Sequence, residues 1–118
     1  MEHNDSNTKM QNLIAHVESF VEERDWEKYH NPKDLAESIC IEAAELLQLF
    51  QWTSPEETAK VKTDANKVTR IKEELADVMI YCLSMANTLE IDLTNAIIEK
   101  IESNKKKYPI EEYRGKAP

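Results

Sequence analysis

The sequence predicts an all-α fold, and two observations support this. Only one glycine, Gly115, occurs in 118 residues, whereas average usage would give about eight. Apolar residues recur at helical spacing in four segments, with proline or a capping residue near most of their ends. We therefore expect one domain over residues 1–118, with a core at about 10–109, built as a four-helix antiparallel bundle.

The first two helices follow from apolar spacing and one proline. A helix over about 7–24 carries apolar residues at positions 10, 13, 14, 17, 20 and 21. Residues 26–30 then form a connection. Asn31 and Pro32 supply an N-cap and a first-turn proline, which predict a second helix over about 32–52.

The second half of the chain contains two more predicted helices. Ser54 and Glu57 stand at capping-box spacing and open a short turn. Residues 58–67 lack an apolar face and predict a mobile loop. A third helix is expected over about 68–89, and Asp92 caps a fourth that runs to about 107, before Pro109. We expect the tail, 110–118, to be poorly ordered.

Charge and composition exclude several classes of function. The net charge is −8, made up of −10 over 1–98 and +2 over 99–118, which argues against a nucleic-acid-binding surface. A single glycine cannot build a Gly-rich phosphate loop or a dinucleotide-binding turn. No apolar run approaches the roughly 20 residues of a membrane helix, and the polar N-terminus lacks a secretion signal, so we expect a cytoplasmic protein without a membrane partner.

Carboxylates interrupt the apolar stripes of two predicted helices. On the second helix Glu42 falls between apolar positions and Glu45 lies one turn further along. On the third helix Glu74 and Asp77 share one flank. Like charges near 4 Å repel by about 4 kcal/mol at an effective dielectric near 20, so the four acids predict a bound cation. Oxygen ligands without histidine or thiol favour Mg²⁺, or Mn²⁺, over Zn²⁺; basic partners or a solvated face are the alternatives.

Other polar and aromatic residues are candidates for substrate contact. On the fourth helix Lys100 and Asn104 fall on the inward stripe and Tyr108 continues the row. Lys100 could equally well bind a phosphate or form a salt bridge with one of the acids. Trp26, His30 and Trp52 flank the second helix, where tryptophan can cover the core or stack on a nucleobase.

These motifs together resemble a known family. Glu42-Ala-Ala-Glu45, followed after 28 residues by Glu74-Leu-Ala-Asp77, is similar to the ExxE…ExxD signature of the MazG-like superfamily, the all-α nucleoside triphosphate pyrophosphohydrolases. The dCTP pyrophosphatase branch is resembled in four segments: RDWEKYHNP (24–32), EAAELLQLFQW (42–52), EELADVMIYCL (73–83) and KIESNKKKYP (100–109). The resemblance covers about residues 10–109.

The resemblance implies Mg²⁺-dependent cleavage of a nucleoside triphosphate, dCTP or a modified dCTP, into monophosphate and pyrophosphate. Glu42, Glu45, Glu74 and Asp77 would bind metal, and Glu45, or else Glu42, would activate water. The residues implied to contact substrate are Trp26, His30 and Trp52 around base and sugar, Tyr81 nearby, and Lys100, Asn104 and Tyr108 at the phosphates. With the limited core of so short a chain, it also implies a bundle completed by oligomerisation, as a homodimer or homotetramer.

Two other classes of function stay open from the sequence. A di-iron four-helix protein also carries internal glutamates, but it needs Glu-x-x-His on two helices. Here the only such motif is Glu27 to His30, outside the main helical stripes. A helical interaction module without enzymatic activity, with the acids paired to bases, is the other alternative.

Overall fold

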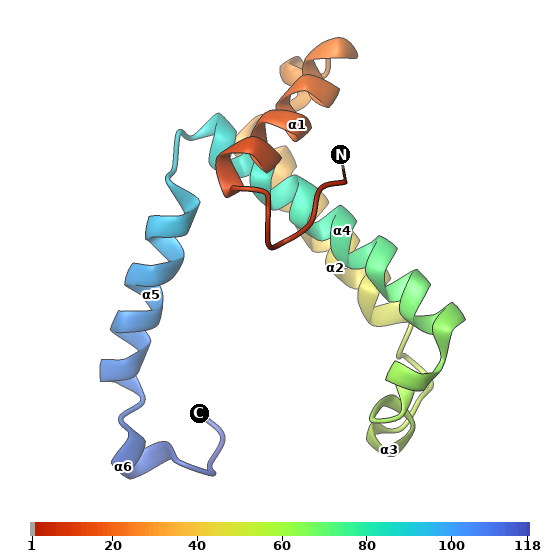
Figure 1. The fold of residues 1–118 in the computed structure, drawn as a ribbon, viewed down its shortest axis with the longest axis vertical. Coiled ribbons are helices and arrows are strands. Elements are labelled where there is room, and N and C mark those ends of the chain that lie inside the picture. Colours follow the sequence, from red (N-terminus) through yellow and green to blue (C-terminus); the bar gives the residue numbers. More distant parts are fainter. Residues whose placement is uncertain (1) are drawn as a thin grey trace.

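The computed structural model describes residues 2–118 and is helical throughout, without a β-strand in that range (Figure 1). The all-α prediction is therefore confirmed. The four long helices are α1 (Met10–Glu23), α2 (Pro32–Gln48), α4 (Ala65–Thr88) and α5 (Leu93–Lys107). Single-turn elements join or follow them: η1 (Glu27–Tyr29), α3 (Pro55–Thr58), η2 (Val61–Thr63) and α6 (Ile110–Tyr113). No described helix is both long and apolar enough to cross a membrane.

The antiparallel pair of α2 and α4 forms the centre of the fold, and α1 packs on α4 near its C-terminal end (Figure 1). The fully buried apolar side chains gather where these three helices meet: Val21, Leu35, Leu83 and Ala86. Burying the three larger side chains, those of Val21, Leu35 and Leu83, contributes about 1.5–3 kcal/mol each. The core is thus concentrated at one end of the α2–α4 pair, and the acids on the middle of both helices lie beyond it.

Side-chain caps fix where these helices begin. Asn31, Ser54 and Asp92 accept hydrogen bonds from backbone amides three residues ahead, at 2.9, 3.1 and 2.9 Å, as the sequence predicted. Asp64 makes the same contact with the amide of Lys67 at 3.1 Å. Helix α4 therefore starts at residue 65, whereas apolar spacing predicted 68, because its first turn is held by a cap and needs no apolar face.

At the C-terminal ends of two helices, a residue other than glycine adopts the left-handed backbone conformation. Asp25 after α1 and Glu90 after α4 have φ of 55° and 54°. Each end has the Schellman pattern: the amide of Trp26 donates to the carbonyl of Val21 at 3.1 Å, and the amide of Ile91 donates to that of Ala86 at 2.9 Å. The turn at the end of α1 therefore determines where Trp26 lies relative to that helix.

Helix α5 does not pack along the α2–α4 pair and points away from it (Figure 1). Its isoleucines at 97, 98 and 101 are exposed. The radius of gyration is 17.3 Å, against about 13.5 Å for a compact domain of this length. Within one chain, therefore, α5 does not close the predicted bundle.

Two predictions about irregular segments differ from the structure. The expected loop at 58–67 is shortened by η2 and by the early start of α4. The tail forms one helical turn, α6, in which Tyr113 packs edge-on against Tyr108 with ring centroids 5.2 Å apart. A helix cap orders the first segment and an aromatic contact orders the second. Neither interaction produces a periodic apolar pattern in the sequence, so neither segment was predicted to be ordered.

Candidate metal and nucleotide site

Helices α2 and α4 bring three acids together. Glu42 and Glu45 lie one turn apart on α2, Glu74 lies on α4, and each offers a carboxylate oxygen within 4.8 Å of the others. The antiparallel pairing of the two helices produces this meeting, because it sets the middle of α2 against the middle of α4. We call Glu42, Glu45 and Glu74 the acid cluster.

The acid cluster has no basic partner among residues 2–118: the ion pairs formed there involve other acids. Glu42 and Glu74 each keep one buried carboxylate oxygen, Oε2, without a hydrogen-bond partner. Burying a carboxylate in this way is costly unless the group is protonated or bound to a cation. Salt bridging within the chain therefore does not account for these acids.

Burial and neighbouring charges raise the pKa of two members of the cluster, Glu42 and Glu74, above that of an ordinary carboxyl group. Burial, and then the neighbouring Glu45, raise the pKa of Glu42, with smaller contributions from Asp77 and Glu74. Burial and the charge of Glu45 likewise raise the pKa of Glu74. A divalent cation would reverse these shifts, and the all-oxygen donor set fits a hard cation.

Asp77 lies one turn beyond Glu74 on α4 but outside the tight cluster. Its side chain is exposed, and it does not share the 4.8 Å spacing of the three glutamates. Its charge nevertheless raises the pKa of both Glu42 and Glu74. Asp77 is thus close enough to act on the cluster electrostatically.

A small pocket lies beside the buried core, towards the C-terminal end of α4. Its volume is about 190 Å³, and three residues predicted from the sequence line it: Trp26, His30 and Tyr81. The indole of Trp26 is 44% exposed and packs edge-on against Phe20, with ring centroids 5.7 Å apart. An exposed aromatic face at a pocket mouth is available for stacking on a planar ligand.

The same pocket contains residues that sequence reasoning missed. They are Tyr29, Asp34, Leu35 and Ser38, from η1 and the first turns of α2. Tyr29 stands in the segment already singled out for its aromatic content. Asp34 and Ser38 gave no signal, because polar residues near a helix start are expected without any function.

One chain does not bring the remaining predicted residues to this place. Trp52 follows the far end of α2 and is 88% exposed. Lys100 and Asn104 belong to α5 and Tyr108 is its C-cap, and α5 points away from the acid cluster (Figure 1). Their contact with substrate stays a prediction, which requires a second copy of the chain.

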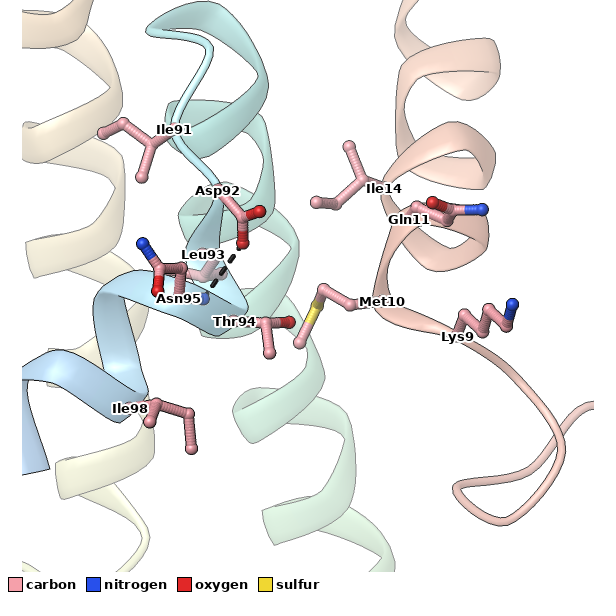
Figure 2. Close-up of a pocket in the computed structure, with 10 residues that line it drawn as sticks. All are labelled: Lys9, Met10, Gln11, Ile14, Ile91, Asp92, Leu93, Thr94, Asn95 and Ile98. Carbon is pink, nitrogen blue, oxygen red and sulfur yellow. Dashed lines mark hydrogen bonds between the residues drawn. The ribbon is translucent and has the colours of Figure 1, made fainter.

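An open groove of about 570 Å³ lies between the start of α1 and the start of α5 (Figure 2). Figure 2 shows Met10 and Ile14 on one side of it and Ile98 on the other, with the cap bond from the amide of Asn95 to Asp92 between them. The groove is mainly apolar and contains no member of the acid cluster. It is therefore separate from the candidate site.

A family model and curated proteins of known name both match this chain. Residues 37–117 match the model of the MazG-like family. The chain is 38% identical over 98 residues to dCTP pyrophosphatase 1 of Rattus norvegicus, and 36% identical over 90 residues to that of Homo sapiens. These alignments cover 83% and 76% of the chain but 58% and 53% of the relatives. The chain thus spans only a little over half the length of these curated relatives.

A solved structure shares both fold and sequence with this chain. It is the crystal structure of a pyrophosphatase from Archaeoglobus fulgidus, with a TM-score of 0.79 and 41% identity, covering 92% of this chain and 98% of that one. The family match extends over more than half of the chain and includes the acid-bearing parts of both α2 and α4. On this evidence the chain belongs to the MazG-like family.

Proposed function

We propose that the protein hydrolyses nucleoside triphosphates between the α and β phosphates, releasing monophosphate and pyrophosphate, with dCTP or a modified dCTP as its substrate. The observation that carries this proposal is the acid cluster, with two buried carboxylate oxygens that have no partner in the described part of the chain. Relatives named dCTP pyrophosphatase 1 support the substrate, and the solved pyrophosphatase supports the reaction.

The metal in this proposal is Mg²⁺, or Mn²⁺ in its place, held by Glu42, Glu45, Glu74 and Asp77. When bound, such an ion neutralises phosphate oxygens and lowers the pKa of water. Glu45 is the exposed member of the cluster, so its carboxylate can take a proton from an attacking water that arrives from solvent. Glu42 is the alternative base, but its half-buried position, with one carboxylate oxygen fully buried, suits a fixed ligand better.

The pocket beside the core is proposed to hold the sugar and base. Trp26 offers an aromatic face, His30 and Tyr81 offer hydrogen-bonding groups, and Tyr81 lies one turn beyond Asp77 on α4. A triphosphate bound at the acid cluster can therefore extend along α4 into the pocket. A small pocket with polar walls favours a single pyrimidine ring over a purine.

We also propose that the working enzyme is a homo-oligomer, a dimer or a tetramer. Isoleucines on α5 are exposed, an apolar groove lies open beside them and the chain is extended, which suits a surface that a partner covers. Charge favours a second copy as the partner, because residues 99–118 carry +2 and residues 1–98 carry −10. Lys100, Asn104, Tyr108 and Trp52 would then complete the site of the adjacent subunit.

Product analysis tests the reaction directly. The protein is incubated with Mg²⁺ and each of the four common deoxynucleoside triphosphates, the ribonucleotides and 5-methyl-dCTP, and pyrophosphate release is measured. We expect Mg²⁺-dependent release, with the highest kcat/KM for dCTP or 5-methyl-dCTP. Diphosphate and orthophosphate as products would refute the reaction class, and equal kcat/KM for dCTP and the purines would refute the preference. Iron-dependent absorbance would favour a di-iron protein, and absence of turnover a binding module.

A further inference from the structure

A second small cavity adjoins the pocket beside the core. We call it the Ser84 recess: it has a volume of about 210 Å³ and lies where α1, η1 and the end of α4 meet. His30 lines both the recess and the pocket of Trp26 and Tyr81. The two spaces therefore border the same side chain, that of His30.

The recess contains a buried hydroxyl without a partner. Ser84 is only 5% exposed, and its Oγ has no hydrogen bond. A serine within a helix ordinarily satisfies its hydroxyl on the carbonyl one turn earlier, and Ser84 does not do so. Only three buried side-chain polar atoms in residues 2–118 lack a partner, and the other two belong to the acid cluster. Such an atom requires a ligand or a water to satisfy it.

The recess lies in line with the acid cluster. Asp77, Tyr81 and Ser84 follow one another at spacings of four and three residues and so share one face of α4. Seven residues of helix separate Asp77 from Ser84, or about 10 Å along the axis. A nucleotide with its phosphates at the acids and its sugar beside Tyr81 would bring the far edge of its base to Ser84.

The lining of the recess is rich in hydrogen-bond acceptors. Glu18 from α1 and Glu27 from η1 contribute carboxylates, which only accept when ionised, whereas Ser84, Asn87 and Thr88 contribute groups that can both accept and donate. Glu18 is half-buried, and the apolar floor includes Val21, which is 7% exposed. The two carboxylates favour a ligand group that donates hydrogen bonds over a carbonyl oxygen, and a hydroxyl that donates to one of them is left as an acceptor toward the ligand.

We propose that the Ser84 recess reads the base of the substrate by accepting hydrogen bonds from its exocyclic amino group, and that Ser84 is a specificity-determining residue. The inference rests on the proposed function, which supplies the nucleotide. It predicts that a 4-amino pyrimidine is preferred over the nearly isosteric 4-oxo pyrimidine. A site that loses its matching group leaves buried polar atoms unpaired and discriminates strongly for that reason.

The test compares dCTP with dUTP in the wild-type protein and in Ser84→Ala. We expect Ser84→Ala to lower the ratio of kcat/KM for dCTP to that for dUTP by about tenfold, the effect of one lost hydrogen bond. Glu18→Gln, which replaces an acceptor with a group that can also donate, should lower the same ratio. The matched control is Ser19→Ala, because Ser19 is exposed on α1 and does not line the recess; its ratio should equal that of the wild type.

Binding of the monophosphates provides a measurement that does not depend on turnover. Calorimetric titration should show tighter binding of dCMP than of dUMP by the wild type, and a smaller difference in Ser84→Ala. An unchanged ratio and an unchanged binding difference in Ser84→Ala would overturn the inference, as would a change confined to the ratio of dCTP to CTP. If the wild-type protein released no pyrophosphate from any triphosphate, the proposed function would fail instead, which is a distinguishable result.

Discussion

Glu42 on α2 and Glu74 on α4 meet across the helix pair, and each has a buried carboxylate oxygen that no donor within residues 2–118 reaches. Burial and the surrounding acids raise the pKa of both groups. In the absence of a cation, the packing of the two helices therefore opposes the repulsion between their carboxylates. Binding of a cation would remove this repulsion.

Neutralising one of these acids should separate activity from stability. Glu42→Gln and Glu74→Gln are each expected to abolish pyrophosphate release while keeping or raising the melting temperature of the metal-free protein, because each substitution removes a repelling charge. Calorimetry without metal and an assay with Mg²⁺ measure the two effects. Glu56→Gln is the matched control, since Glu56 is exposed on α3, and it should change neither quantity. Near-normal activity in both cluster variants would contradict the metal assignment.

The raised pKa values of Glu42 and Glu74 also determine how the stability of the fold changes with pH. The ordinary value for these carboxyl groups is 4.5, and that of the folded state is higher, so the folded state holds protons that the unfolded chain has released. This contribution to stability is lost as pH rises from 4.5 through the folded pKa. Mg²⁺ binds the ionised acids, so its stabilising effect should grow over about the same pH window.

Thermal unfolding at several pH values, with and without Mg²⁺, measures this effect. The gain in melting temperature on adding Mg²⁺ should be larger at pH 7 than at about pH 5. Glu42→Gln should flatten the dependence, because it removes one of the titrating groups. A gain from Mg²⁺ that was independent of pH would show that the ion acts elsewhere.

Replacing Glu90, which has a left-handed backbone conformation, by glycine should stabilise the fold. Glu90 has φ of 54° at the end of α4, where a side chain costs roughly 1–2 kcal/mol that glycine avoids. Glu90→Gly is expected to raise the free energy of unfolding by about 1 kcal/mol in denaturant titrations. Glu90→Ala removes the same charge but keeps a Cβ, so it should give no such gain. Equal effects of the two substitutions would assign the change to charge.

The proposed sharing of sites between subunits predicts complementation. Glu74→Gln and Lys100→Ala proteins should each be inactive, because one lacks a metal ligand and the other a phosphate contact. After subunit exchange, mixed oligomers would pair intact acids with an intact lysine, and about a quarter of all sites would recover in a random mixture of dimers. Pyrophosphate release from the mixture measures this recovery. Sedimentation of the wild type as a 13.7 kDa monomer would contradict the proposal.

The sequence predicted the helices well where caps and apolar spacing agreed, as for α2 after Asn31 and α5 after Asp92. It missed the start of α4 because the cap at Asp64 precedes the apolar face. The meeting of Glu42, Glu45 and Glu74 followed from helical spacing and antiparallel pairing. Ser84 could not be recognised, because a small residue inside an apolar stripe is compatible with simple packing, and only its missing hydrogen bond distinguishes it.

The placement of the buried core at one end of the α2–α4 pair has a consequence for dynamics. Amide groups near Leu83 and Ala86 are covered by three helices, so their hydrogen exchange should require the largest opening of the structure. The acid-bearing middle of the pair and the turns of α3 and η2 contain no fully buried side chain, and they should exchange through smaller, more frequent openings. Within the α2–α4 pair, the structure should therefore be more rigid beside the pocket of Trp26 than where the carboxylates meet.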